Sequence, residues 1–327
     1  MNHFRTIVSI SPSDHKIGLK NGVFTIGSCF AEAIGTRLNE SKFKVMINPF
    51  GTTYNPISIH QCLSYALNNE GPREHTYLER EGIHLNYDFH SHFSALGQNY
   101  LQTAIHQAVQ ASNDFLKSAS SVLVTYGTAW IYRRKDSGQI VNNCHKMPAQ
   151  SFDKQLLTET EICDSFEALY RQAKKLNSSI KFILTLSPVR HVKDSLTLNS
   201  VSKAVVRSAC HRIATTYADV EYFPAFEIMM DDLRDYRFYR SDMLHPTEQA
   251  EDYIWEKFMA CYLDKPTADF VKEWSAILSA LRYKPFHPES ESHQKFLKNV
   301  LTKLLSLQSD VNVAAEIANV ESQLIKR

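Results

Sequence analysis

Five short apolar runs, each followed by a stretch with helical periodicity, constrain the fold of this chain more than any other feature. Runs of this kind, with several β-branched residues, are typical of strands buried on both faces. Strands that alternate with helices pair in parallel through right-handed crossovers. The sequence therefore predicts one parallel sheet between two layers of helices, with strands near residues 23–26, 44–47, 121–125, 181–186 and 220–223.

The end of the chain has a different pattern. From Thr267 onward apolar residues recur only at helical spacing, and Pro285 and Pro288 separate the first of these segments from the second. We therefore expect a sheet domain over residues 1–265 and a helical extension over residues 266–327. The extension would pack on the sheet domain or on a second subunit.

Composition excludes several classes of partner. The chain has 327 residues and a net charge of +1, so it offers no strongly charged surface to nucleic acid or to a membrane. No apolar run reaches the length of a membrane span, and the N-terminus lacks the apolar core of a signal peptide. The six cysteines lack C-x-x-C spacing, which is typical of reduced thiols. We expect a cytoplasmic protein, and its oligomeric state stays open.

The stretch Thr25-Ile26-Gly27-Ser28-Cys29-Phe30-Ala31 lies where the first strand gives way to a helix. Ser28 would then stand at a helix N-terminus, where free N–H groups and the helix dipole favour negative charge. A nucleophilic Ser and its oxyanion need such an environment. Two alternatives remain, because a Ser at this place is also a good N-cap and because Cys29 is a second candidate nucleophile.

A second polar pair follows the fifth strand. Asp242 precedes His245 by three residues, so both side chains can point toward one site. Asp242 could hold the imidazole tautomer while His245 takes a proton from Ser28. Sites in open parallel sheets form beyond the carboxyl ends of the strands, where all three residues are predicted to lie. Together they indicate a Ser-His-Asp triad, whereas D-x-x-H alone would indicate only a turn.

At these residues the chain resembles the GSCFA family, a branch of the SGNH (GDSL-like) hydrolases. Gly27-Ser28-Cys29-Phe30-Ala31 spells the family signature. The resemblance covers roughly residues 24–258 and continues through residues 48–56, 88–91, 125–130, 187–190, 222–224, 234–239 and 242–246. It implies a flavodoxin-like sheet with strand order 2-1-3-4-5, and Ser28 as nucleophile with Asp242 and His245 as its partners.

The resemblance also implies an oxyanion hole, with one departure. SGNH enzymes use a Gly after the second strand and the Asn of a G-x-N after the third. Gly51 and Gly127 match the two glycines, but Ala129 stands where the Asn would be. Loss of one oxyanion donor costs ~10²–10³ in rate, so another group must replace it or the site is weak. Candidates from the matching loops are Asn48, Asn55 and His90.

Residues 71–98 are polar and rich in His, and they also carry several aromatic residues. We expect a long functional loop that lies over the carboxyl edge of the sheet, with His90 pointing into the pocket. A metal site is the alternative interpretation, with ligands from Asp88, His84, His90 and His92. A substrate loop explains the segment better, so no metal or other cofactor is predicted.

Two further sets of residues could contact a substrate. Ser187 and His191 flank the end of the fourth strand and could line the pocket. Arg190 and Arg240 could bind an anionic group, with a surface position or a salt-bridge network as the alternative.

The sequence thus predicts a serine esterase that cleaves an O-acyl ester on a carbohydrate or a small polar molecule. The acyl class rests on the resemblance. Backbone N–H groups of Ser28 and Gly51 would stabilise the oxyanion. Three alternatives stay open: an acyltransferase with the same site, a non-catalytic binding module, which Ala129 makes credible, and a metal-dependent hydrolase.

Overall fold

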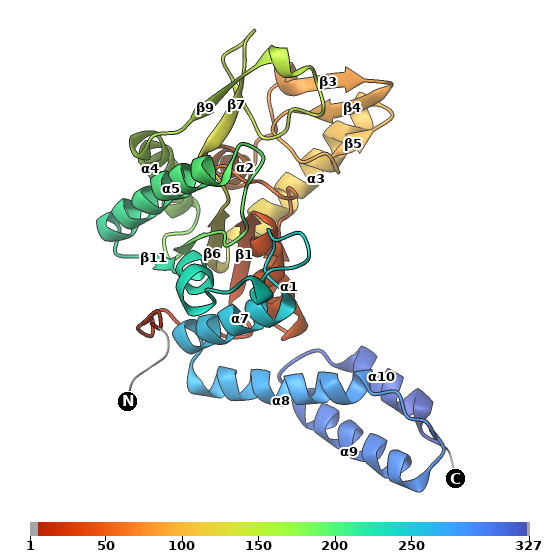
Figure 1. The fold of residues 1–327 in the computed structure, drawn as a ribbon. Coiled ribbons are helices and arrows are strands. Elements are labelled where there is room, and N and C mark those ends of the chain that lie inside the picture. The colour runs from red at the N-terminus through yellow and green to blue at the C-terminus, as the bar shows by residue number, and fades with distance from the viewer. Residues whose placement is uncertain (1–5, 326–327) are drawn as a thin grey trace.

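The computed structural model describes residues 6–325 and has a five-stranded sheet at its centre (Figure 1). Every neighbouring pair of strands in this sheet is parallel. In the order β2-β1-β6-β10-β11 the strands are β2 (Val45–Ile47), β1 (Gly22–Gly27), β6 (Ala119–Tyr126), β10 (Lys181–Leu186) and β11 (Val220–Phe223). The predicted strands and their flavodoxin-like order 2-1-3-4-5 are confirmed.

Helices cover both faces of this sheet, because its strands send alternate side chains to two separate cores. Phe24 of β1 lies in one core and Val23 in the other. The first core is covered by α2 (Pro56–Asn68), α3 (Gln98–Leu116), α4 (Glu159–Leu176) and α5 (Leu196–Thr216). The second is covered by α1 (Cys29–Glu40), α7 (Glu248–Tyr262) and the short turns α6 (Ala225–Glu227) and η3 (Ile228–Asp232). The three-layer α/β/α prediction is confirmed.

Two small antiparallel sheets lie together at the end of the molecule opposite the C-terminal helices (Figure 1). One contains β3 (Tyr77–Arg80), β4 (Ile83–Asn86) and β5 (Ser94–Ala95), with η1 (Glu74–Thr76) before it. The other contains β7 (Trp130–Arg134), β8 (Ile140–Val141) and β9 (Phe152–Leu156), with η2 (Ala149–Ser151). The expectation that residues 71–98 form a loop is therefore wrong in part. These strands are short and mostly half-exposed, so their pattern resembles that of a loop.

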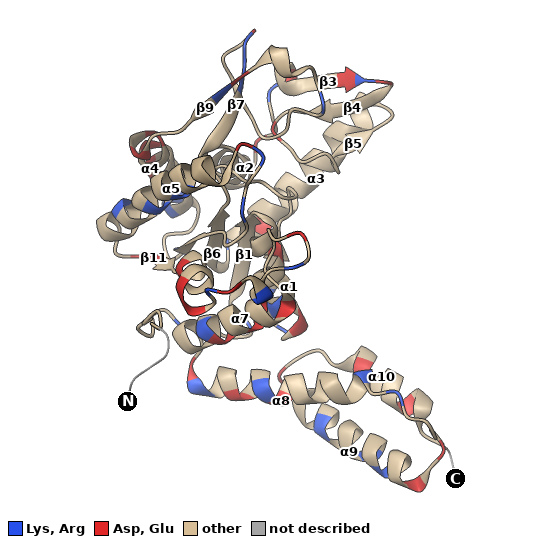
Figure 2. Cartoon of the chain, viewed as in Figure 1, with Lys and Arg blue, Asp and Glu red and all other residues tan. Residues whose placement is uncertain are grey.

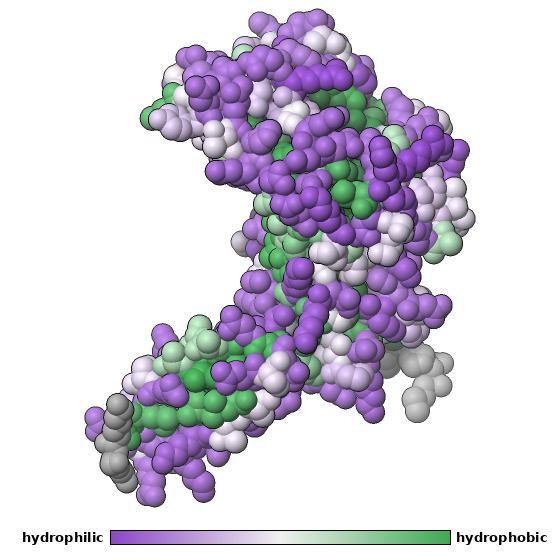
Figure 3. Space-filling view, turned by 180° about the vertical axis from the view of Figure 1, so that it is seen from behind, coloured by the Kyte–Doolittle hydropathy of each residue, from purple (hydrophilic) through white to green (hydrophobic). Residues whose placement is uncertain are grey.

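After Thr267 the described chain is all helical, as predicted, with α8 (Lys265–Arg282), α9 (Glu291–Leu307) and α10 (Ala314–Gln323). These helices extend away from the sheet as an arm, along which apolar side chains form a stripe (Figures 1 and 3). The arm has its own core around Trp274 and Leu304. Its contact with the sheet domain includes a hydrogen bond from Trp274 Nε1 to the Glu40 carbonyl at 2.6 Å.

Acidic and basic residues are mixed along the helices and strands of the ribbon (Figure 2), in keeping with the net charge of +1. Among residues 6–325 the structure contains no helix with the length and apolarity needed to cross a membrane. All six cysteines lie in the described part of the chain and are free thiols. The cytoplasmic location stays a prediction.

Candidate active site

The first component of the site is the turn between β1 and α1. Gly27 has φ +136°, and a Cβ there would lie 2.1 Å from the Thr125 carbonyl oxygen, so only glycine fits. Ser28 follows as the N-cap of α1, and its Oγ accepts a hydrogen bond from the Phe30 N–H at 3.3 Å. Its side chain is fully buried. Ser28 therefore lies at a helix N-terminus, where the sequence placed it.

The second component is the pair formed by Asp242 and His245. Nδ1 of the imidazole lies 2.7 Å from Asp242 Oδ2, so the expected contact is present. Asp242 Oδ1 accepts the backbone N–H groups of His245 at 3.0 Å and Leu244 at 2.8 Å. These two N–H groups, followed by the imidazole, lower the pKa of Asp242 to about 2. An ionised carboxylate favours the tautomer with the proton on Nδ1, which leaves Nε2 able to accept a proton.

Two arginines fix the loop that carries this pair. The Arg190 guanidinium lies 4.0 Å from the ring centroid of Tyr239, and its backbone N–H donates to the Leu244 carbonyl at 3.2 Å. Arg240 donates from Nη2 to Glu251 Oε1 at 3.1 Å. Its Nε donates to the carbonyl of Pro246, which follows His245, at 2.8 Å. Of the two roles considered for Arg240, the structure therefore shows the salt-bridge network.

The helix after this loop begins at Glu248. Thr247 is the N-cap of α7, and its Oγ1 accepts the Ala250 N–H at 3.3 Å. Pro246 pairs with Tyr239 in an isolated bridge that closes the loop. His245 is thereby held by a closed loop rather than by the helix itself.

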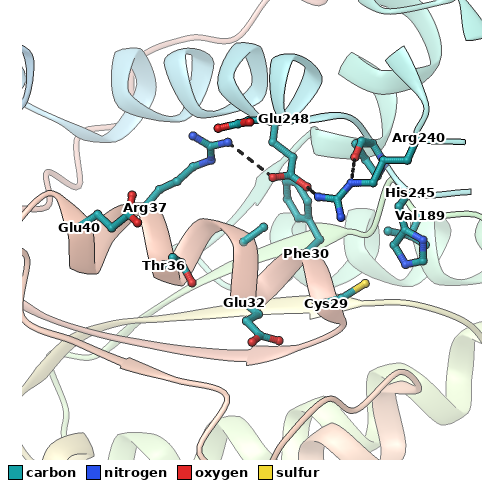
Figure 4. Close-up of a pocket in the computed structure, with 13 residues that line it drawn as sticks. Cys29, Phe30, Glu32, Thr36, Arg37, Glu40, Val189, Arg240, His245 and Glu248 are labelled. Carbon is teal, nitrogen blue, oxygen red and sulfur yellow. Dashed lines mark hydrogen bonds and ion pairs between the residues drawn. The ribbon is translucent and has the colours of Figure 1, made fainter. Parts of the chain in front are cut away.

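A cavity of about 420 Å³ lies between α1 and α7, and His245 and Cys29 line it together (Figure 4). Ser28 is adjacent in sequence but does not line this cavity, and within residues 6–325 it makes no hydrogen bond to His245. Burial raises the pKa of the Cys29 thiol, and the N–H groups of Cys29 and Phe30 offset this only in part. Cys29 is therefore a protonated thiol near neutral pH, which weakens the case for it as nucleophile.

The backbone N–H groups expected to form the oxyanion hole already have acceptors. Ser28 donates to the Thr125 carbonyl at 3.1 Å, and Gly51 donates to the Asn48 carbonyl at 2.8 Å. Gly127 donates to the Tyr54 carbonyl at 2.7 Å. Their role as oxyanion donors stays a prediction, and it requires them to share or leave these acceptors.

The side-chain amides of the two candidate asparagines, Asn48 and Asn55, differ in their hydrogen bonds. Asn48 accepts the Gly27 N–H at 2.9 Å through Oδ1, while its Nδ2 is buried and has no hydrogen-bond partner among the described residues. Asn55 is the N-cap of α2, where Oδ1 accepts the Ser58 N–H and Nδ2 donates to Ser58 Oγ, both at 2.9 Å. Asn48 Nδ2 therefore has no acceptor beside the Ser28 turn, whereas Asn55 Nδ2 already donates to Ser58.

The His-rich segment reaches the carboxyl edge but not the cavity. Gly51 has φ +76°, and a Cβ there would lie 2.5 Å from His90 Cβ and 2.6 Å from His92 Cε1. The segment therefore covers the Gly51 loop. Within the described structure no residue of the range 71–98 lines the cavity beside His245, and the place of His90 in a substrate pocket stays a prediction.

Of the four candidate metal ligands, His90 and His92 lie together, with their Nδ1 atoms 3.2 Å apart, whereas Asp88 and His84 have other partners. Asp88 accepts a hydrogen bond from Tyr65 at 2.7 Å, and His84 lies 3.9 Å from Glu79. Over the described range of the chain, no three side chains of His, Cys, Asp or Glu are grouped as metal ligands. No residue set here therefore favours the metal-dependent alternative.

Sequence reasoning missed Lys203. This fully buried lysine on α5 donates from Nζ to the carbonyls of Gly127 at 2.9 Å and Ser187 at 2.6 Å, and so ties the loops after β6 and β10. Burial lowers its pKa to about 7. The available signal was periodicity, because Lys203 lies seven residues before Cys210 on the buried face of α5.

Comparison with known proteins gives a family for this chain. The model of the GSCFA family matches residues 22–258, and a model described as the C-terminal domain of GSCFA domain proteins matches residues 274–326. The search of curated proteins found no match. Among solved structures the chain is similar to an acetyl xylan esterase from the rumen bacterium Butyrivibrio proteoclasticus, with 10% identity and a TM-score of 0.33. That similarity covers 78% of this chain and 64% of the esterase, so the chain spans less than two thirds of it. The signature at Gly27–Ala31 and the match over residues 22–258 show that the chain belongs to the GSCFA family.

Proposed function

We propose that this protein hydrolyses an O-acyl ester on a carbohydrate or a small polar molecule, with Ser28 as nucleophile. The observation that carries the proposal is the Asp242–His245 pair, whose imidazole and carboxylate lie 2.7 Å apart. His245 lines a cavity with the first residues of α1, the helix that Ser28 caps. A general base beside a helix N-terminus is what a serine hydrolase requires.

The reaction would run in two halves. Ser28 Oγ attacks the ester carbonyl carbon and gives its proton to His245 Nε2, while Asp242 stays ionised and stabilises the imidazolium. Collapse of the tetrahedral intermediate breaks the C–O bond, and the leaving alcohol takes the proton from His245. Water then attacks the acyl-enzyme with His245 as base again, which releases the acid and restores Ser28.

Ser28 must first turn toward His245. Its Oγ now accepts the Phe30 N–H at 3.3 Å, which is longer than a strong hydrogen bond and inexpensive to break. Catalytic hydrogen bonds are often loose without substrate and tighten when it binds. In that state the free Nδ2 of Asn48, next to the Ser28 turn, can donate to the oxyanion.

Hydrolysis is favoured over acyl transfer by the exposure of the proposed base. The His245 side chain is 40% exposed, so water has access to the base. An acyltransferase with the same residues would have to keep water away from its acyl-enzyme. A binding module without turnover is favoured by Ala129 in place of an Asn donor and by the occupied N–H groups of Ser28 and Gly51.

Kinetics on simple esters test the proposal. Acid release from 4-nitrophenyl acetate and from acetylated sugars is measured for the native chain, for Ser28→Ala and for Cys29→Ala. We expect Ser28→Ala to lose ~10³-fold or more in kcat, whereas Cys29→Ala retains hydrolysis. Full activity of Ser28→Ala would move the nucleophile to Cys29.

The same assay separates the alternatives. An acylated sugar that forms when an acceptor sugar is added would indicate a transferase. Sugar binding with no ester turnover by the native chain would indicate a binding module.

A further inference from the structure

His191 has an unused polar atom in the candidate site. Its Nε2 is buried and has no hydrogen-bond partner among the described residues. The residue is held firmly, because its backbone N–H donates to Asn199 Oδ1 at 2.9 Å and its ring packs edge-on against Tyr54 with centroids 5.4 Å apart. A buried polar atom without a partner is unfavourable in the resting protein, so its retention indicates a partner that arrives later.

This atom lies against the Gly127 loop, where the family resemblance places the missing oxyanion donor. In the sheet Thr125 pairs with Gly27, so the turn at Gly127 lies just beyond the strand end that carries Ser28. A Cβ added at Gly127 would lie 3.1 Å from His191 Nε2. Ala129, where the family resemblance calls for an Asn donor, is buried and offers no polar side chain.

Electrostatics keep His191 neutral. Burial, followed by the charges of Lys203 and His245, lowers its pKa to about 3. It therefore cannot compete with His245 as a base near neutral pH. A neutral imidazole still carries one N–H, and a neutral His can polarise a carbonyl as a hydrogen-bond donor. The segments that carry the two imidazoles are in direct contact, because the backbone N–H of Arg190 donates to the Leu244 carbonyl at 3.2 Å.

From this geometry we infer that His191 donates from Nε2 to the oxyanion and so replaces the Asn that is missing at Ala129. The inference rests on the proposed esterase function and deepens it. When Ser28 Oγ bonds to the carbonyl carbon, the π electrons move to the carbonyl oxygen and the Ser28 proton moves to His245. His191 keeps its own proton throughout, and its Nε2–H bonds to the new oxyanion.

Two substitutions at one position separate donation from packing. His191→Phe keeps a ring but removes the donor, whereas His191→Gln restores an N–H donor. We expect His191→Phe to lower kcat for ester hydrolysis by ~10²–10³ with KM nearly unchanged, because the bond forms only in the transition state. His191→Gln should recover at least a tenth of the native kcat. The matched control is His211→Phe. His211 is exposed and lies on α5, the helix that also carries Asn199, the hydrogen-bond partner of His191.

Several outcomes would overturn this inference. One is a His191→Phe variant that keeps more than a tenth of the native kcat. Another is a His191→Phe variant in which KM rises while kcat stays the same. The third is an equal loss of kcat in His191→Phe and His191→Gln. If the native chain hydrolyses esters through Ser28 under any of these outcomes, the proposed function stands and only the role of His191 fails. If Ser28→Ala hydrolyses as well as the native chain, the proposed function itself fails.

A measurement without substitution covers the case in which His191→Phe does not fold. In the ¹⁵N-labelled native chain, NMR should show the His191 proton on Nε2, unchanged between pH 5 and pH 9 because the pKa is about 3. Adding phenylboronic acid, which forms a tetrahedral adduct with an active serine, should move that proton resonance downfield. A proton on Nδ1, or no shift when the adduct forms, would contradict the inference.

Discussion

Asp242 stays ionised through the whole range in which a histidine titrates, because its two backbone donors and the imidazole lower its pKa to about 2. A fall in activity at low pH should then not come from protonation of Asp242. Activity should fall as pH falls, because an imidazolium cannot accept the Ser28 proton. A profile of kcat/KM from pH 4 to pH 9 checks this, and rates that do not change across that range would contradict it.

Replacing Asp242 tests whether its carboxylate supports His245 as the base. Asp242→Asn should lower kcat by ~10⁴. The amide would stabilise the wrong tautomer of the His245 imidazole, and it carries no charge to stabilise the imidazolium. The fold should persist, since the amide oxygen of the substituted side chain can still accept the N–H groups that Asp242 now accepts. Circular dichroism provides the control, and near-native kcat in a folded variant would show that Asp242 does not serve His245.

At the residue scale the sequence names candidate residues but does not predict their hydrogen bonds. Motif and spacing place Ser28, Asp242 and His245 at one edge of a parallel sheet, and their catalytic roles stay a prediction. The acceptors of the Ser28 and Gly51 N–H groups come from the tertiary structure, as do the free Nδ2 of Asn48 and the burial of Lys203. No local pattern encodes those partners.

Among the elements, the β1–α1 turn depends on Gly27. Its φ of +136° and the 2.1 Å approach of an added Cβ to the Thr125 carbonyl leave no room for alanine. Gly27→Ala should therefore lower the free energy of unfolding by about 3 kcal/mol or more, measured by urea denaturation. Gly71→Ala is the control, since its Cβ would meet only His106 Nδ1, at 3.8 Å. Equal stability of the two variants would contradict this account of the turn.

Lys203 joins α5 to the loops after β6 and β10, and its burial has a consequence for stability. Its pKa is about 7 in the folded chain, against 10.5 for an ordinary lysine, so between these values the unfolded chain binds more protons. The contribution of Lys203 to stability should therefore rise as pH rises from 7 toward 10. Urea denaturation of the native chain and Lys203→Met at pH 7 and pH 9.5 measures it.

The stability difference between those two proteins should move in favour of the native chain at the higher pH. The exposed Lys175→Met serves as control and should show no such change. A difference between the native chain and Lys203→Met that is the same at both pH values would contradict the buried, pKa-shifted state of Lys203.

Buried strands are easier to predict from the sequence than exposed strands. The three inner strands of the central sheet, β1, β6 and β10, are almost fully buried, and their apolar runs are visible in the sequence. The strands β3 to β5 and β7 to β9 include exposed charged residues such as Glu79 and Asp153, and pairing with a neighbour rather than local pattern makes them strands. Only the tertiary structure could show them.

On the scale of the whole molecule, the C-terminal arm has a core separate from those of the sheet domain. Besides the Trp274 hydrogen bond to Glu40, Lys42 Nζ lies 4.9 Å from the Trp274 ring centroid and 2.7 Å from Glu316 Oε1. Trp274 is therefore both a core residue of the arm and its link to the end of α1.

Trp274→Ala should loosen the arm and leave the candidate site intact. Loss of a buried Trp costs ~3–5 kcal/mol, so limited proteolysis should cut within α8 to α10 much faster than in the native chain. Ester hydrolysis should persist. Phe286→Ala is the control, because Phe286 is 96% exposed. Proteolysis as slow as in the native chain would contradict this view of the arm.

The central claim is that Ser28 is a nucleophile served by His245 and Asp242. The most direct measurement is to react the full chain with a fluorophosphonate and to locate the adduct by peptide mass spectrometry. The structure and the proposed mechanism predict one phosphonyl adduct, on Ser28, that also forms in Cys29→Ala and is missing in Ser28→Ala and His245→Ala. An adduct on another residue, or none on the folded native chain, would contradict the claim.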